Sequence, residues 1–599
     1  MIYHCEDHTC NYWDEGEKLP ERCPQCGRKL LRANEADMTG DDWTALGNTL
    51  WYAEASDKKR MVDCFRKAAY LGSAWGVCNL GICMEQGNGV EADPVQAFWL
   101  YRQAVEMGSL NAVCCLGVCY QYGIGTAPDA EKAAELYCKA AEYGSPRGQM
   151  LLARAFHDGI GVEADAAEAV YWVRAAAYQR YGEGMHRLGV CYEYGDGVEQ
   201  NWERAVHWFR EAAESGVSVA MTDLGYCYEK GCGVEQSWEQ AFSWYRRGAE
   251  CGYPVSMSNL GLCYQMGYGV EQNWQEAIKW YEQGAQCGDL QSMHNLACCY
   301  EGGEGVEQNE DRAFYWYRRS AEGGNGSAMC NLGRCYKRGY GVEQNWQEAV
   351  KWYEQGAQCG NLHSMHNLAC CYEHGEGVEQ NMTEAIRWYT AAAEGGNADA
   401  MHDLGWHYDH GEGVEQDMKK AICWYERAAE QNHPAAMNSL GECYAMGRGV
   451  PRDLETAMEW YRRAAELGEA MADYNMGWHL EQAGKLSEAY AHYRKAADGN
   501  DDSAWWALGR FYENGVVVAQ DGKEARRCYE TGEKLGSVKC KMRLARCKLL
   551  GIGGRREKKA GLDLCRQALE LAKESSEKED YGYEAEMNLL RRTIAENES

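Results

Sequence analysis

Four cysteines near the amino terminus have a spacing that directly predicts chemistry. Cys5, Cys10, Cys23 and Cys26 follow the pattern C-x4-C-x12-C-x2-C. Zinc takes four thiolate or imidazole ligands in a tetrahedron, and two closely spaced pairs let a short segment surround the ion without a hydrophobic core. We therefore expect a structural Zn²⁺ ion, because four protein ligands leave no coordination position for a substrate.

The ligand set has alternatives within the same segment. His8 lies three residues after Cys5 and can replace Cys10. His4 is a second, weaker candidate, and a redox pair or unpaired surface thiols are the other interpretations. The Cys-Pro-Gln-Cys-Gly half resembles a zinc-ribbon knuckle, whereas the first half matches more loosely. The resemblance implies a small zinc-ribbon-like segment over residues 1–36.

A second set of polar residues recurs along the rest of the chain, one position before a repeated leucine or methionine. An Asn at helical intervals facing a groove can bond a peptide backbone through both its donor and its acceptor. The predicted peptide-binding residues are Asn259, Asn295, Asn331, Asn367 and Asp403. Hydrogen bonds to the backbone of the adjacent repeat are an equally good interpretation. The preceding position holds histidines that either make binding depend on pH or are solvated: His186, His294, His366 and His402.

One weak match to a catalytic motif occurs. The residues Ser56 to Lys59 satisfy S-x-x-K, the pattern of the penicillin-binding nucleophile, in what we expect to be a turn between helices. No K-T-G or S-D-N partner motif accompanies it, and no Gly-x-Gly pair leads into a phosphate-binding motif. We therefore predict a non-enzymatic protein with no catalytic residues. A cell-wall or penicillin-processing enzyme is the alternative.

The elements that position these residues follow from a repeat of 36 residues. Each copy is anchored by a leucine, or once a methionine, that is followed in most copies by glycine. Residues 273–308 and 345–380 differ at only four positions, as expected of a duplicated block. The fifteen anchors are Leu46, Leu80, Leu116, Leu152, Leu188, Leu224, Leu260, Leu296, Leu332, Leu368, Leu404, Leu440, Met476, Leu508 and Leu544.

Each copy predicts two helices joined by a glycine-containing turn. The recurring residues of the first helix fall at intervals of three and four, which lines them along one face. Gly267 and its equivalents end this helix, and Pro254 and its equivalents fit the first turn of the next one. Asp, Asn or Ser recurs at the expected N-cap of the second helix, in the register Asp93, Asp129, Asp165, Asn201, Ser237, Asn273, Asn309, Asn345, Asn381, Asp417 and Asp453.

The pattern Leu-Gly-x-x-Tyr-x-x-Gly-x-Gly-Val, followed by Ala-x-x-Trp-Tyr-x-x-Ala-Ala-Glu-x-Gly, resembles the Sel1-like repeat (SLR), a subfamily of the tetratricopeptide repeats. The resemblance covers residues 41–570. It implies an all-α fold, a right-handed superhelical solenoid of about fifteen two-helix repeats whose first helices line a concave face. We expect residues 571–599 to form a capping helix at the open end.

The resemblance also implies a function. Tetratricopeptide domains use an Asn on the first helix in peptide clamps, so we expect a scaffold that binds peptide segments of partner proteins on the concave face. The position after the anchor glycine varies freely and is predicted to carry specificity, as in Trp406 and Glu442. The repeated cysteines of the first helix are predicted to be buried thiols. The Trp ladder of the second helix, from Trp172 to Trp460, and the Tyr ladder of the first helix, from Tyr120 to Tyr444, are predicted to be packing layers.

Charge limits the class of partner. Lys and Arg number 61 against 91 Asp and Glu, so the net charge of −30 repels nucleic acid, and a regulator that binds DNA through the ribbon is a weaker alternative. No 18-residue apolar run or secretory signal occurs, so we expect a cytoplasmic protein that does not enter membranes. Residues 521–560 carry thirteen basic and five acidic residues, which predicts either a docking surface for an acidic partner or a solvated end.

Overall fold

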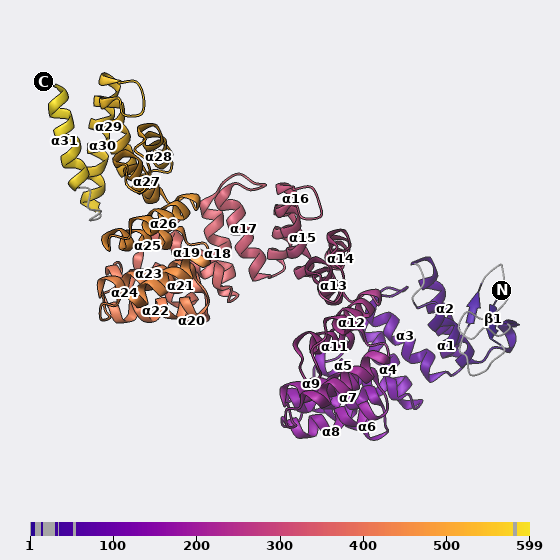
Figure 1. Cartoon of the computed structure of the whole chain (residues 1–599). Coiled ribbons are helices and arrows are strands. Elements are labelled where there is room, and N and C mark those ends of the chain that lie inside the picture. Colours follow the sequence, from indigo (N-terminus) through magenta and orange to yellow (C-terminus); the bar gives the residue numbers. More distant parts are fainter. Residues whose placement is uncertain are drawn as a thin grey trace. The chain divides into compact units, whose positions relative to one another are not determined.

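The computed structural model describes residues 2–5, 13–15, 30–33, 35–51, 55–578 and 584–598. These residues form three short strands and 31 α-helices (Figure 1). The chain divides into two compact units, Met1–Gln308 and Asn309–Ser599, and each is described by itself.

The amino-terminal unit begins with a small antiparallel sheet. Strand β1 (Ile2–Cys5) lies between β2 (Trp13–Glu15) and β3 (Leu30–Ala33), and β2 contacts α1. A 3₁₀ turn over Glu35–Asp37 precedes the helices. These are α1 (Gly40–Thr49), α2 (Ala55–Tyr70), α3 (Ala74–Gln86), α4 (Pro94–Glu106), α5 (Leu110–Tyr122), α6 (Ala130–Glu142), α7 (Pro146–Asp158), α8 (Ala166–Tyr178), α9 (Gly182–Tyr194), α10 (Trp202–Glu214), α11 (Ser218–Lys230), α12 (Trp238–Glu250), α13 (Pro254–Met266), α14 (Trp274–Gln286) and α15 (Leu290–Gly302).

The described part of the carboxy-terminal unit is helical. Its helices are α16 (Glu310–Glu322), α17 (Gly326–Arg338), α18 (Trp346–Gln358), α19 (Leu362–His374), α20 (Met382–Gly395), α21 (Ala398–His410), α22 (Met418–Glu430), α23 (Pro434–Met446), α24 (Leu454–Glu466), α25 (Ala470–Gln482), α26 (Leu486–Asp498), α27 (Asp502–Asn514), α28 (Gly522–Lys534), α29 (Val538–Leu550), α30 (Lys558–Lys578) and α31 (Glu584–Glu598). The predicted capping segment, residues 571–599, thus contains the end of α30 and all of α31.

Helices pair as the repeat predicts. Within each unit an odd-numbered helix packs against the even-numbered helix that follows it, from α1 with α2 to α13 with α14, and from α17 with α18 to α29 with α30. Helices α15 and α16 hold the register of the remaining repeat, one in each unit. The predicted pairing is therefore seen in fourteen of the fifteen expected two-helix repeats, seven in each unit.

The predicted helix ends are also confirmed. The side chain of Asn273 accepts a hydrogen bond from the backbone N–H of Glu276 at 3.2 Å, which caps α14. Gly339 ends α17 in the left-handed conformation at φ 74°, where a side chain would be strained. Pro254 occupies the first turn of α13, where a missing amide hydrogen costs no bond. Local sequence therefore sets the boundaries of the helices.

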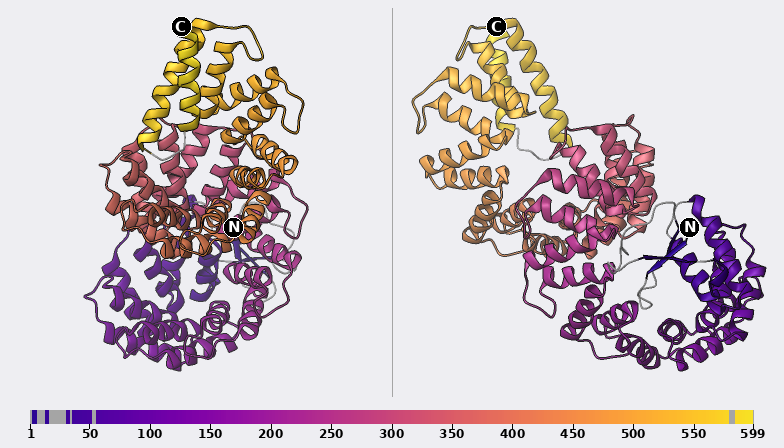
Figure 2. Two further views of the ribbon diagram at one scale, coloured as in Figure 1. Left: turned by 60° about the vertical axis from the view of Figure 1, so that its left-hand side comes forward. Right: turned by 90° about the vertical axis from the view of Figure 1, so that its right-hand side faces the viewer.

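The odd-numbered helices form the inner layer of each unit. Helix α13 contacts both α11 and α15, and α17 contacts α19, so these helices lie close to their equivalents in the next repeat. Even-numbered helices of neighbouring repeats are not in comparable contact among the described residues, which places them outside the odd-numbered ones. Figure 2 shows the helix pairs arranged in curved rows. We call the inner layer the odd-helix face of a unit.

Two further expectations can be compared with the structure. The predicted cysteine row, such as Cys83 and Cys263, lies buried as thiols, and burial raises the pKa of both to about 12. The expected turn at residues 56–59 is wrong, because these residues lie in the first turns of α2. Among the described residues, no helix has the length and apolar character needed to cross a membrane.

Candidate functional site

A buried tyrosine on the even-numbered helix plugs the interior of most repeats. Its ring is almost fully inaccessible, and it lies 21 residues after the anchor in nearly every copy. The anchor glycine makes room for it, because a Cβ added at Gly333 would lie 2.5 Å from the ring of Tyr353. We call this the core-tyrosine position. It is filled by Tyr101, Tyr137, Tyr245, Tyr281, Tyr317, Tyr353, Tyr389, Tyr425, Tyr461, Tyr493 and Tyr529.

The hydroxyl of this tyrosine reaches the odd-numbered helix. The Tyr281 hydroxyl donates to Oε1 of Gln265 at 2.7 Å and is also hydrogen-bonded to the Asn295 side chain, and the nearby Cys299 thiol contributes to raising its pKa. Burial raises the pKa of Tyr281 far above its ordinary value, so the hydroxyl stays protonated. In most copies the buried residue therefore combines an apolar ring with a hydrogen-bonded hydroxyl.

Two repeats have a small residue at the core-tyrosine position, Val173 in the α7–α8 repeat and Cys565 in the α29–α30 repeat. In the α7–α8 repeat, Val173 replaces the tyrosine, and Ala153 follows the anchor. A cavity of about 350 Å³ lies at this place, and we call it the Val173 cavity. It is lined by Met150, Ala153, Arg154, His157, Asp158, Ala169, Val170, Val173, Glu183, Arg187, Cys191 and Asp196.

The Val173 cavity is the space of the missing phenol. The repeat register aligns His157 with Gln265, Arg187 with Asn295, and Cys191 with Cys299. All three residues of the α7–α9 region line the cavity, as their equivalents surround the Tyr281 hydroxyl. Its floor is apolar, because Ala153, Val170 and Val173 are buried.

Charged side chains form the rim of the Val173 cavity. His157 is hydrogen-bonded to Asp158 at 2.7 Å and lies 3.2 Å from Asp196, while Arg154 is 3.4 Å from Asp158. The His157 hydrogen bond holds the pKa of Asp158 below its usual value, whereas burial raises the pKa of Cys191 to about 11. The rim can therefore bond polar groups of a ligand, and Cys191 is a neutral part of the wall.

A second concavity lies on the odd-helix face of the carboxy-terminal unit. It has a volume of about 740 Å³ and is bordered by α21, α23 and the start of α25. Trp406 and Glu442, both at the predicted specificity position, line it together. Trp406 stacks on His410 with ring centroids 4.3 Å apart, so an aromatic surface is held in place there.

The predicted Asn and Asp row makes side-chain bonds between neighbouring repeats. In each bonded pair, the first residue directly precedes the anchor of its repeat. Its partner lies 37 residues earlier, two positions before the anchor of the preceding repeat. Asp403 bonds His366 at 2.9 Å, and Asn367 donates to the Cys330 sulfur at 3.4 Å. The partners are side chains, so the expected bonds to backbone groups of the adjacent repeat are not what these two residues make. Neither cavity is lined by a predicted Asn or Asp.

The other predicted members of the row lie half-buried on odd-numbered helices. Asn295 accepts hydrogen bonds from Gln291 at 2.8 Å and from His294 at 3.3 Å. Asn259 lies on α13 and Asn331 on α17. Their contact with a peptide stays a prediction.

Comparison with known proteins identifies the repeat. The model of the Sel1 repeat matches fourteen consecutive segments: residues 76–109, 112–145, 146–181, 182–217, 218–253, 254–289, 290–325, 326–361, 362–397, 398–433, 434–469, 470–501, 504–537 and 538–573. The chain belongs to the Sel1 repeat family. The α1–α2 pair lies before the first matched segment and shows the same helix pairing.

Two solved Sel1 repeat structures are similar to this chain. A protective antigen of uropathogenic Escherichia coli strains, described as displaying an SLR fold, is 32% identical with a TM-score of 0.52, and the match covers 75% of this chain and 97% of that one. A Sel1 repeat protein from Oxalobacter formigenes is 31% identical with a TM-score of 0.38, covering 41% of this chain and 96% of that one. No curated protein matches the sequence significantly. Sel1 repeat proteins are generally protein-interaction scaffolds.

Two further sequence-predicted sites do not line either cavity. Cys5 ends strand β1, whereas Cys10, Cys23 and Cys26 lie outside the described residues. The basic segment 521–560 is partly neutralised by acidic neighbours. The ion pairs join Arg526 to Glu530 and Glu557, Arg543 to Glu513 and Glu586, and Arg546 to Glu513.

The Val173 cavity was missed by sequence reasoning, although the chain carries a signal for it. The Trp-Tyr pair of the even-numbered helix recurs in seven consecutive repeats from Trp244 to Tyr461. It is broken at Trp172-Val173, while Trp208-Phe209 keeps a ring. The Trp residues pack half-buried against the core as predicted, while the fully buried ring is the residue after them, which sequence reasoning did not single out. A change from ring to Val at that position would have pointed to the cavity.

Proposed function

We propose that the protein is a non-enzymatic scaffold that binds peptide segments of partner proteins on the odd-helix face, with an aromatic side chain anchored in the Val173 cavity. The carrying observation is the combination of an apolar floor and a polar rim at one position where the repeat lacks its own ring. Binding sites of this kind pair apolar burial with a few polar groups that fix orientation.

The occupant follows from the shape of the site. The same space holds a phenol in eleven other repeats, so a tyrosine side chain from a partner has matching dimensions. His157 lies where Gln265 accepts the Tyr281 hydroxyl, which provides a polar contact for an incoming phenol. Burying such a ring contributes about 1.5–3 kcal/mol. An anchor of this size supports specific binding by a mostly polar peptide.

Further contacts are expected along the odd-helix face of each unit. In the carboxy-terminal unit the concavity with Trp406 and Glu442 offers an aromatic surface and a carboxylate. The Asn row, including Asn259, Asn295, Asn331, Asn367 and Asp403, supplies polar side chains for a peptide backbone. Asn367 and Asp403 would exchange their present bonds for bonds to the peptide.

Selection from a random peptide library on the full chain tests the proposal. Val173→Tyr restores the repeat's own ring and fills the cavity. Two repeats with Ala after the anchor, at Ala297 and Ala369, already hold buried tyrosines, so the ring is compatible with Ala153. The matched control is Phe209→Tyr, which adds a hydroxyl to a ring that is already fully buried.

The wild type and Phe209→Tyr should enrich peptides containing Tyr or Phe. Val173→Tyr should bind those peptides at least about tenfold more weakly, because the aromatic anchor is lost. Equal affinity of Val173→Tyr and Phe209→Tyr for the selected peptides would remove the basis of the proposal.

Three sequence predictions remain proposals. A structural Zn²⁺ ion at Cys5, Cys10, Cys23 and Cys26 is supported by the small sheet in which Cys5 ends β1. An acidic partner at residues 521–560 would meet only the basic groups that are not already paired. A cytoplasmic location is expected from the sequence alone.

A further inference from the structure

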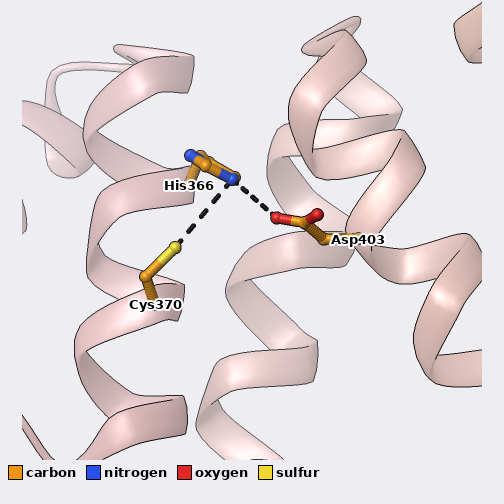
Figure 3. Close-up of side chains that lie close together, drawn as sticks. All are labelled: His366, Cys370 and Asp403. Atoms are coloured by element: carbon orange, nitrogen blue, oxygen red, sulfur yellow. Dashed lines mark hydrogen bonds and ion pairs between the residues drawn. The ribbon is translucent and has the colours of Figure 1, made fainter. Parts of the chain in front are cut away.

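Three metal-binding side chains converge on the odd-helix face of the carboxy-terminal unit. Figure 3 shows His366 and Cys370 on one helix, α19, facing Asp403 on α21. Nε2 of His366 is 2.9 Å from Oδ2 of Asp403 and 3.9 Å from Sγ of Cys370. The three donor atoms all lie within 4.8 Å of one another. The spacing of four residues places His366 and Cys370 on one helix face, and the repeat stacking brings Asp403 opposite.

We propose that His366, Cys370 and Asp403 form a Zn²⁺ site with an open coordination position. Imidazole nitrogen, thiolate sulfur and carboxylate oxygen are the three ligand types of zinc. Bond lengths of about 2.0–2.3 Å in a tetrahedron separate neighbouring ligand atoms by about 3.3–3.7 Å. The observed separations from His366 bracket this range, and the Cys370–Asp403 separation lies within 4.8 Å, so side-chain shifts of about 1 Å would accommodate the ion.

Second contacts hold two of the three ligands in place. Nδ1 of His402 is 3.1 Å from Oδ1 of Asp403, so the carboxylate turns its other oxygen toward His366. The Tyr389 hydroxyl lies 3.3 Å from the sulfur of Cys370 and donates to Glu373 at 2.6 Å. Such outer contacts orient ligands and are typical of metal sites.

The repeat itself shows that this combination is not a by-product of the fold. The same register on α9 and α11 holds His186, Val190 and Asp223, where the His–Asp pair is present at 2.7 Å without a thiol. In the duplicated block, His294 and Cys298 lie 3.9 Å apart, but the residue that corresponds to Asp403 is Asn331. Among the described residues, one group alone brings together three such donors.

Three protein ligands leave a fourth position on a tetrahedral ion. The His366 and Asp403 side chains are 19% and 35% exposed, so water or a donor group from a bound partner can reach that position. Zinc binds a thiolate and an unprotonated imidazole nitrogen, so binding would release to solvent the thiol proton of Cys370 and the proton that Nε2 of His366 holds against Asp403. This site shares Asp403 with the proposed peptide-binding row but no residue with the Val173 cavity, and its test uses no peptide.

Titration of the metal-free full chain with Co²⁺ and Zn²⁺ tests the proposal. Cobalt reports a thiolate ligand through charge-transfer absorption, and the bound equivalents are counted after gel filtration. Asp403→Asn removes one ligand and places at this position the residue found at Asn331 and Asn367, so folding is preserved. Val190→Cys supplies the missing thiol beside His186 and Asp223.

The wild type should bind one equivalent more than Asp403→Asn, and Val190→Cys one more than the wild type. Any ion held by the amino-terminal cysteines contributes equally to all three proteins and cancels in the differences. A wild-type count and spectrum in Asp403→Asn would overturn the proposal.

Discussion

The α7–α8 repeat and the α17–α18 repeat share one backbone plan but differ in what fills it. In the second, Gly333 faces the fully buried ring of Tyr353. In the first, Ala153 and Val173 leave a cavity of about 350 Å³ rimmed by charged side chains. The comparison shows that a repeat can keep its two helices and its packing against neighbouring repeats without the buried tyrosine ring. A binding site can therefore arise where the interior of one copy departs from the others.

The largest effect is expected from emptying a filled repeat. Tyr353→Val should lower the free energy of unfolding by about 3 kcal/mol, because it removes a buried ring and leaves a cavity. Amide hydrogen exchange in α17 and α18 measures this locally, since a long repeat array need not unfold in one step. Tyr353→Phe is the control, because it keeps the ring. Unchanged exchange in Tyr353→Val would mean that the ring is not a plug.

Filling the empty repeat should have the opposite and smaller effect. Val173→Tyr is expected to slow exchange in α7 and α8 by an amount equivalent to about 1 kcal/mol, as cavity-filling substitutions commonly do. Phe209→Tyr should change exchange in α9 and α10 by less, because no space is filled there. If Val173→Tyr destabilised α7 and α8, the cavity would not be the space of a missing ring.

The smallest effect concerns the charged side chains at the rim of the Val173 cavity. In the repeats that hold a core tyrosine, a protonated hydroxyl lies at this place. The pKa of Asp158 is lowered in the folded protein, so its contribution to stability is present above the ordinary Asp pKa of about 3.9 and is lost as the pH falls through its folded value. The side chain is 39% exposed, so the effect should stay below about 1 kcal/mol. As the pH is lowered, amide hydrogen exchange in α7 should speed up less in Asp158→Asn than in the wild type. An identical pH response in both proteins would contradict the assignment.

The sequence predicted the helix boundaries and the repeat spacing of this molecule better than its candidate sites. Helix caps such as Asn273 and turns such as Gly339 depend on neighbours within a few residues, so spacing alone locates them. The partner of Asp403 is 37 residues away on another helix, and sequence left open whether it was a backbone group or a peptide. The structure instead brings together His366 and Asp403, two positions that the sequence had identified separately.

The Val173 cavity depends on contacts among three helices, α7, α8 and α9, which the sequence pattern of one helix does not give. The register relates Val173 to the buried tyrosines, but burial decides which ring of the Trp-Tyr pair faces inward. The ladder of helix caps could be predicted because it repeats. The cavity could not be located in the same way, because it is the place where the repeat changes.

Titration with p-cresol, the isolated side chain of tyrosine, tests the central claim most directly. Methyl NMR signals of Val170 and Val173, both in the cavity floor, report its entry. Saturable shifts of the Val170 signal are predicted in the wild type and in Phe209→Tyr, with none in Val173→Tyr, whose own ring occupies the site. Equal saturable shifts of Val170 in Val173→Tyr, or no shift in the wild type, would contradict the account.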